Sequence, residues 1–325
     1  MVMSLLTRPK KSVATIVIAT DGSGDFNCDG IADDVEIQAA IDSLPAGGGC
    51  IYMKEGDYLI EQSINLDIES LGIFGCGWAT RIYTNNNIPM FHITQGHVTL
   101  SDFQIEGNGA GAINYGIYAD NADELTIQNL WIHDTGYIGI YLYMSTDCVL
   151  NGNFIEETNC GISADGSGSL RFHDNFIKDA ITSGVILYNT NDNLIDSNVI
   201  QECGSNGIYL LWSGYNVVSN NNIFSNGDNG LEIDGMEDVI SKRGRNIIDG
   251  NIIRNNNING IKITTKSDFD CVTSNALHNN SNYGISIETA NCDVALISSN
   301  FINNNLNGAI RDLGTNTQVF NNREI

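Results

Sequence analysis

The chain has 325 residues and carries 39 acidic against 15 basic side chains, which gives a formal net charge of −24 at pH 7. This excess of negative charge argues against nucleic acid as a partner, because phosphate binding requires clustered lysine and arginine. It also disfavours a polyanionic substrate unless metal ions or a local basic patch offset the repulsion. No apolar run reaches the roughly 18 residues that a membrane-spanning helix needs, so no membrane span is expected.

Residues 1–48 are predicted to form an N-terminal unit, followed by a repeat region over residues 49–325. Residues 12–20 indicate a strand and residues 21–36 a loop rich in glycine and aspartate. A helix is predicted to begin at Asp33 or Asp34 and to run through Leu44. Such a helix would cover the apolar end of the repeat region. Its predicted apolar stripe consists of Val35, Ile37, Ala40 and Ile41.

Residues 1–11 place basic residues after a very short apolar stretch, which is not the order of a secretory signal. Either a signal has been removed beforehand or the protein leaves its cell by another route, for example on a virus particle. We therefore expect an extracellular or virion-associated protein.

The acidic loop before the helix matches the calcium-loop pattern D-x-[DN]-x-[DN]-G-x5-E at every position. A strand rather than a helix precedes it, and a helix N-cap with an acidic turn is the alternative interpretation. The predicted ligands of a structural Ca²⁺ are Asp25, Asn27, Asp29, Asp33 and Glu36. No organic cofactor is expected, because the glycines at 75 and 77 precede no phosphate-binding helix.

From residue 116 onward a glycine followed by an apolar residue recurs nine times, at steps of 22 to 24 residues with one step of 30. Apolar residues fall at i and i+2 between turn residues, which indicates short strands and fits no helical period. Three strands per period make one turn of a solenoid, whose inward side chains are buried only by stacking. The nine pairs are Gly116-Ile117, Gly139-Ile140, Gly161-Ile162, Gly184-Val185, Gly207-Ile208, Gly230-Leu231, Gly260-Ile261, Gly284-Ile285 and Gly308-Ala309.

An Asn-x-apolar motif is interleaved with the glycine motif. Asparagine tolerates the left-handed conformation of a tight corner, and stacked asparagines can hydrogen-bond from one coil to the next. The predicted members are Asn153, Asn175, Asn198, Asn222, Asn251, Asn275 and Asn300. The eight cysteines show no CxxC pair or metal spacing and are interpreted mostly as buried thiols, with Cys28–Cys50 the one bridge considered.

Three segments resemble parts of the pectate-lyase-like right-handed parallel β-helix proteins. Residues 29–41 (DGIADDVEIQAAI) are similar to their DG-x-x-DD-x-x-x-IQ-A-A-I segment, residues 47–52 (GGGCIY) to GGG-x-[VI]-Y, and residues 75–82 (GCGWATRI) to G-x-G-x-x-x-T-x-I. The later repeats are similar to those of periplasmic copper-maturation and carbohydrate-binding proteins. The resemblance implies an all-β, right-handed parallel β-helix, which we expect to have about eleven coils. It leaves activity open, because the superfamily includes lyases, hydrolases, epimerases, phage tailspikes and non-catalytic stalks.

The resemblance also implies that the strand beginning at each Gly-apolar pair lines the substrate groove. Alternation sends the second and fourth residues after the glycine outward, which places five tyrosines and several carboxylates on one ribbon. One coil carries a seven-residue insertion within residues 235–246, and such a loop can wall a groove. The residues predicted to bind substrate are Tyr143, Asp165, Tyr188, Tyr209, Trp212, Arg243 and Arg245. A tyrosine ladder that only stabilises the sheet is the alternative.

Acidic residues and a lysine converge beside this insertion. The carboxyls of Glu232 and Asp234 are expected about 6–7 Å apart, and Asp234 lies two coils, roughly 10 Å, from Glu288. Both separations approach that of an inverting glycosidase, which needs room for a water between acid and base. Lys262 lies one coil from Glu232, near enough to pair with it. The predicted catalytic residues are Asp234, Glu232, Glu288 and Lys262.

The favoured hypothesis is a polysaccharide-cleaving enzyme, a glycoside hydrolase that uses Asp234 with Glu232 or Glu288 as acid and base. The nearest alternative is a calcium-assisted polysaccharide lyase or uronate epimerase with a lysine or arginine base. A non-catalytic glycan-binding tailspike or adhesin stalk is a third class. The expected partner is a polysaccharide or cell-surface glycan. The uncapped last coil favours an oligomer, with a homotrimer as the candidate.

Overall fold

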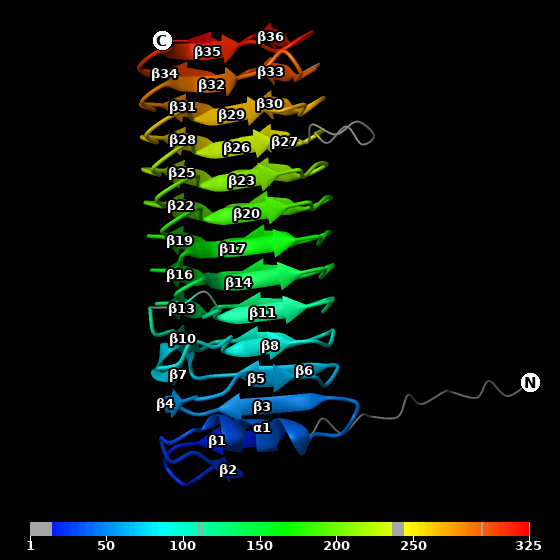
Figure 1. The fold of residues 1–325 in the computed structure, drawn as a ribbon, viewed down its shortest axis with the longest axis vertical. Coiled ribbons are helices and arrows are strands. Elements are labelled where there is room, and N and C mark those ends of the chain that lie inside the picture. The colour runs from blue at the N-terminus through cyan, green and yellow to red at the C-terminus, as the bar shows by residue number, and fades with distance from the viewer. Residues whose placement is uncertain (1–14, 110, 112, 236–243, 294, 325) are drawn as a thin grey trace, which may run out of the picture.

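The computed structural model describes residues 15–109, 111, 113–235, 244–293 and 295–324. Three parallel sheets form a long stack of coils, in which each strand pairs with its equivalents in the coils before and after it (Figure 1). Within the described residues, sheet C has 11 strands and sheet B has 12, so the predicted all-β solenoid is confirmed. No helix in the described part of the chain is long and apolar enough to span a membrane.

The strands of each sheet follow one another along the stack. Sheet A contains β2 (Phe26–Asn27), β1 (Thr15–Ala19), β3 (Gly49–Met53), β6 (Leu71–Phe74), β9 (Thr99–Ser101), β12 (Thr126–Gln128), β15 (Val149–Asn151), β18 (Arg171–His173), β21 (Leu194–Asp196), β24 (Val217–Ser219), β27 (Ile247–Asp249), β30 (Cys271–Thr273), β33 (Leu296–Ser298) and β36 (Gln318–Phe320). Sheet B contains β4 (Gly56–Leu59), β7 (Thr80–Tyr83), β10 (Gln104–Glu106), β13 (Trp131–His133), β16 (Phe154–Glu156), β19 (Phe176–Lys178), β22 (Val199–Gln201), β25 (Asn222–Phe224), β28 (Ile252–Arg254), β31 (Ala276–His278), β34 (Phe301–Asn303) and β37 (Arg323–Glu324). Sheet C contains β5 (Ile64–Leu66), β8 (Phe91–Ile93), β11 (Ile117–Asp120), β14 (Ile138–Tyr143), β17 (Cys160–Asp165), β20 (Val185–Tyr188), β23 (Ile208–Leu211), β26 (Leu231–Asp234), β29 (Ile261–Thr264), β32 (Tyr283–Ile287) and β35 (Gly308–Asp312).

The glycine motif marks the start of the sheet C strands, where neighbouring coils come into close contact. A Cβ on Gly139 would lie 2.7 Å from the carbonyl oxygen of Gly161 and 2.9 Å from Cγ2 of Ile155. Glycine is required there because both atoms belong to the packed interior. The residue after each glycine points inward and is fully buried, as Ile140 is. The ninth pair is the exception, because Gly308 pairs with Tyr283 and is therefore one residue out of register.

Buried asparagines at the corner between sheets A and B form a continuous ladder, as predicted. Nδ2 of Asn153 donates to Oδ1 of Asn175 at 2.9 Å, and that oxygen also accepts the backbone N–H of Asn153. The same pair of bonds repeats from coil to coil. The described members are Asn153, Asn175, Asn198, Asn221, Asn251, Asn275, Asn300 and Asn322.

One predicted member of the ladder was wrong by a single residue. Asn221 is buried and donates to Asn251 at 2.9 Å, whereas Asn222 is the first residue of β25. Both positions satisfy the Asn-x-apolar pattern, because Ile223 and Phe224 are both apolar. Only Ile223 is fully buried, and the inward position decides the register.

Helix α1 (Asp34–Asp42) covers the N-terminal end of the stack, and its Ile37, Ala40 and Ile41 join the hydrophobic core. The predicted stripe was wrong at Val35, which is 61% exposed. The side chain of Asp33 makes no capping bond to the helix. Its carboxylate instead accepts the backbone N–H groups of residues 29, 30 and 59, so it ties the loop and β4 to the helix start.

A second asparagine ladder ends on a buried acid. Asn193, Asn216 and Asn246 stack at the corner that leads from sheet C into sheet A, and Asn246 donates its backbone N–H and Nδ2 to Oδ1 of Asp270 at 2.9 and 3.0 Å. The hydroxyl of Ser267 donates to the other oxygen. Burial raises the pKa of Asp270 to about 6.

The ladder register predicts different costs for two neighbouring substitutions. Asn221→Ala removes two donated bonds and leaves the buried N–H of Asn198 without an acceptor, so it should lower the free energy of unfolding by about 3 kcal/mol. Asn222→Ala should change it by less than about 1 kcal/mol. Guanidinium unfolding of both variants measures the difference, and equal losses would contradict the observed register.

Asp270 predicts a pH dependence of stability. Between an unfolded pKa near 4 and a folded pKa of about 6, the folded state binds the extra proton, so stability falls as pH rises and is lowest above pH 6. Asp270→Asn should remove this loss, so the variant should gain about 3 kcal/mol in free energy of unfolding at pH 7.5 and nearly nothing at pH 4. Unfolding of both proteins across that range tests it. Asp192→Asn, on an exposed corner, is the control that should leave the pH profile unchanged.

Candidate functional site

The outer face of sheet C carries two rows of outward side chains, because each strand pairs in register with the next. The first row runs through Tyr118, Tyr141, Ser163, Ile186, Tyr209, Glu232, Lys262, Ser286 and Arg311. The second row runs through Asp120, Tyr143, Asp165, Tyr188, Leu211, Asp234 and Thr264. The predicted alternation is therefore confirmed, and the predicted tyrosines and carboxylates share one face.

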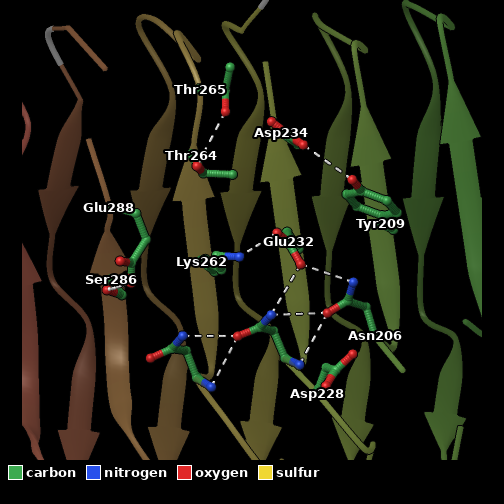
Figure 2. Close-up of polar contacts among 12 residues, drawn as sticks. Asn206, Tyr209, Asp228, Glu232, Asp234, Lys262, Thr264, Thr265, Ser286 and Glu288 are labelled. Atoms are coloured by element: carbon green, nitrogen blue, oxygen red, sulfur yellow. Dashed lines mark hydrogen bonds and ion pairs between the residues drawn. The ribbon is translucent and has the colours of Figure 1, made fainter. Parts of the chain in front are cut away.

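Glu232 in the first row is held by three donors (Figure 2). Lys262 donates to Oε1 at 2.7 Å, and the side-chain amides of Asn206 and Asn229 donate to Oε2 at 3.0 and 3.1 Å. Only 12% of the Glu232 side chain is exposed. With both oxygens occupied, this carboxylate is a structural anchor of the face.

Asp234 lies two residues further along the same strand and is held differently. Its Oδ2 accepts the hydroxyl of Tyr209 at 3.2 Å, as Figure 2 shows. Its Oδ1 is buried and makes no hydrogen bond in the described structure. Burial, together with the charges of Asp234 and Glu232, raises the pKa of Tyr209, so that hydroxyl is a protonated donor. An unpartnered buried carboxylate oxygen is costly and therefore marks a candidate ligand-binding atom.

Glu288 follows β32, two coils from Asp234. It accepts the hydroxyl of Ser286 on Oε1 and a guanidinium N–H of Arg311 on Oε2 at 2.9 Å. Its side chain is 23% exposed. Glu288 is thus an ion-paired carboxylate that still reaches the surface of the same face.

The predicted substrate-binding residues other than the two arginines fall into three groups. Tyr143, Asp165 and Tyr188 are direct register neighbours in the second row, and burial raises the pKa of Asp165. Trp212 follows β23 and packs on Tyr188 with ring centroids 5.0 Å apart. Tyr209 contacts Asp234, as described above.

The predicted Arg245 does not lie on these rows. Arg245 sits at the corner before β27, where it donates to the Tyr215 hydroxyl at 2.6 Å and stacks between Tyr215 and Phe269. Arg243 and most of the insertion that contains it lie outside the described residues.

Three residues that hold the site were missed from the sequence. Asn206 and Asn229 belong to a third asparagine ladder, and each directly precedes the glycine of its coil. This recurrent Asn-Gly pair was a signal that could have identified them. Arg311 was missed because the register shift at Gly308 moves it to an outward position that the glycine count assigns to Ile310 and Asp312.

The predicted calcium ligands lie around the start of α1. Asp25, Asn27 and Asp29 each accept a backbone N–H of the loop or of β1, and both oxygens of Asp33 are used by backbone donors. Among the described residues, the ligand-type atoms of Cys28, Asp33 and Glu36 lie within 4.8 Å of one another. Oε2 of Glu36 is buried without a partner, which suits a cation.

The neighbouring thiol suits calcium less well than an oxygen would. Burial raises the pKa of Cys28 to about 12, so it is a neutral thiol there, and Ca²⁺ prefers oxygen ligands. The eight cysteines are all free thiols. Calcium binding by this loop stays a prediction.

The comparisons with known proteins support the fold. A family described as periplasmic copper-binding protein (NosD) matches residues 79–240, which contain β7 to β26. No curated protein matches the chain in sequence. Among solved structures, the Dettilon tailspike protein is 17% identical with a TM-score of 0.80, and the match covers 95% of this chain and 68% of that one.

Two enzymes have the same fold. The catalytic unit of the GH87 alpha-1,3-glucanase from Streptomyces thermodiastaticus is 15% identical, with a TM-score of 0.76 over 98% of this chain and 69% of that one. The A-module of the mannuronan C-5 epimerase of Azotobacter vinelandii is 17% identical, with a TM-score of 0.67 over 95% of this chain and 99% of that one. The chain has a right-handed parallel β-helix fold, as the sequence resemblance implied.

We expect calcium to stabilise the N-terminal cap, because a ligand that binds only the folded state adds stability by mass action. The melting temperature should be higher in millimolar Ca²⁺ than in excess EGTA, and Glu36→Gln should remove the difference. Asp21→Asn, which neutralises a nearby acidic residue outside the predicted ligand set, should keep the difference in melting temperature. Identical melting in calcium and EGTA would contradict the prediction.

Proposed function

We propose that this protein is a glycoside hydrolase that cleaves a neutral polysaccharide on the outer face of sheet C. The observation that carries the proposal is the Asp234 carboxylate, which has one oxygen on a protonated tyrosine and the other buried without a partner. A sugar hydroxyl or a water would satisfy that oxygen. A carboxylate held in this way can transfer a proton to or from a glycosidic oxygen or a water.

Glu288 is the better second carboxylate of the predicted pair. Glu232 is held by three donors, Lys262 and two amides, whereas Glu288 is held by two, Ser286 and Arg311. Glu288 is more exposed and lies two coils from Asp234, roughly 10 Å by strand spacing. This separation is close to that of an inverting pair, in which a water fits between base and sugar.

The charges of the face favour hydrolysis of a neutral chain over lyase or epimerase chemistry on a uronate. A uronate carboxylate needs a cation to offset its charge, and Lys262 and Arg311 are already paired with Glu232 and Glu288. The net charge of −24 opposes a polyanion as well. The GH87 alpha-1,3-glucanase is a hydrolase with this fold, whereas the mannuronan C-5 epimerase has the same fold and a different activity. The fold alone therefore does not decide between the two chemistries.

A non-catalytic tailspike-like glycan binder is the second candidate, and the TM-score of 0.80 with the Dettilon tailspike favours it. Its site would use the same tyrosines without turnover. For either function we propose a place outside the cytoplasm, in the extracellular space or on a virion. The homotrimer stays a prediction for both.

The hydrolase proposal predicts that Asp234→Asn lowers turnover by roughly a hundredfold or more, since amides cannot transfer the proton. The melting temperature should stay nearly unchanged, because the amide oxygen can still accept from Tyr209. Asp249→Asn is the matched control, an outward sheet A carboxylate that also accepts a hydroxyl, from Thr273 at 2.7 Å. It should retain full activity.

The assay is a panel of polysaccharides read both by reducing ends and by absorbance near 235 nm, where unsaturated lyase products absorb. New reducing ends without that absorbance support hydrolysis, and absorbance supports a lyase. Binding without either product supports the tailspike-like alternative. Full activity of both Asp234→Asn and Glu288→Gln would place the catalytic centre elsewhere.

A further inference from the structure

A second aromatic surface lies on sheet B, away from the two rows of sheet C. It begins at Trp78, which is 56% exposed and lies in the 3-10 turn Gly77–Ala79 between β6 and β7. One ring of Trp78 packs on Trp131 of β13, with centroids 4.9 Å apart and planes tilted by 48°. The turn thus holds an indole out of the sheet with a large surface open to solvent.

The aromatic surface continues along the stack from coil to coil. Trp131, Phe154 and Phe176 are direct register partners on β13, β16 and β19, and Phe154 stacks on Phe176 with centroids 5.1 Å apart. Trp78 also reaches Phe154, with centroids 6.2 Å apart. We call these four rings the sheet B strip. Cross-strand stacking explains the two phenylalanines. It does not explain Trp78, which belongs to no strand and gains little burial.

A row of hydrogen-bonding groups runs beside the strip, two residues further along each strand. It consists of Glu106, His133, Glu156 and Lys178, which are also register partners. The indole N–H of Trp131 donates to Glu156 at 2.9 Å, which joins the two rows. Aromatic faces beside fixed polar groups are the combination that recognises sugar rings, whose C–H faces stack and whose hydroxyls hydrogen-bond.

The charges beside the strip are paired with one another. Arg81 holds Glu106 with bonds of 2.6 and 2.8 Å, and Lys178 lies 2.7 Å from Glu156. His133 contacts Asp134 at 2.7 Å and Gln104 at 2.7 Å, and it is nearly buried. Because both cations are engaged by carboxylates, an anionic sugar would meet no unpaired positive charge in these rows. A neutral sugar chain would find donors and acceptors in fixed positions.

We propose that the sheet B strip is a second, non-catalytic binding site for a neutral glycan, with Trp78 as the stacking residue. The site is distinct from the proposed catalytic face, because sheets B and C are separate faces of the same stack (Figure 1). A second copy of the chain is the competing occupant of an exposed aromatic surface. Paired charges and an acidic net charge favour the neutral glycan over it.

The three tryptophans separate the two faces experimentally. Trp78 and Trp131 lie on sheet B, whereas Trp212 packs on Tyr188 of sheet C. In an Asp234→Asn, Trp212→Phe protein, tryptophan fluorescence reports the sheet B strip alone and no cleavage interferes. The probes are hexasaccharides of neutral glucans, mannans and galactans, with oligogalacturonates as the anionic comparison.

We expect at least one neutral hexasaccharide to shift this fluorescence saturably, and oligogalacturonates to leave it unchanged. Trp78→Ala, introduced into the Asp234→Asn protein so that no cleavage interferes, should weaken binding of that hexasaccharide in calorimetry by about five- to tenfold. Phe301→Ala, a 37% exposed ring elsewhere on sheet B, should not. In the chain with Asp234 intact, Trp78→Ala should leave kcat on short oligosaccharides unchanged. A failure of the sheet B proposal is therefore distinguishable from a failure of the proposed hydrolase site.

Three results would overturn the proposal. One is no fluorescence change with any neutral probe at millimolar concentration. Another is a response that persists after Trp78→Ala. The third is a change of oligomeric state on Trp78→Ala in light scattering, which would make the strip an interface between copies of the chain.

Discussion

The backbone hydrogen bonds between successive coils are the constraint on which the rest of the structure depends. Parallel pairing places each residue beside its equivalent one coil on, about 4.8 Å away, so every choice of side chain is repeated next to itself. Inward isoleucines become a continuous core, and corner asparagines become ladders in which each buried amide satisfies the next. A side chain that does not fit disturbs the coils on both sides of it, which explains why glycine and asparagine recur so regularly.

The same constraint builds sites from residues that are distant in sequence. Glu232 meets a lysine 30 residues later and an asparagine 26 residues earlier, because each is one coil away. Buried polar groups on these faces are therefore either satisfied by the adjacent coil or conspicuous when they are not. The stacking of coils alone thus determines which polar side chains are fully hydrogen-bonded and which still have an atom that can bind a ligand.

Periodicity made the fold, the inward positions and the outward rows predictable from the sequence, since a two-residue alternation has few registers. It failed where two registers satisfied the same pattern, as at Asn221 and Asn222, and where the repeat slipped by one residue at Gly308. Asp33 was predicted as a cap or a metal ligand because of its place in the motif. Its carboxylate is used by backbone groups instead, and one of them is the N–H of residue 59 in a later strand, which no local pattern reveals.

The candidate site shows most clearly what the pattern could not distinguish. Glu232 and Asp234 are both acidic, both outward and two residues apart, so the sequence makes both of them candidates for the acid and base pair. Their neighbours differ: one ladder amide from the preceding coil and one from the same coil reach Glu232, whereas a tyrosine hydroxyl of the preceding coil reaches only one oxygen of Asp234. Since a fully bonded carboxylate holds its charge and its place, while a half-bonded one still has an oxygen to offer, the adjacent coil decides which of the two acids is free to act on a ligand.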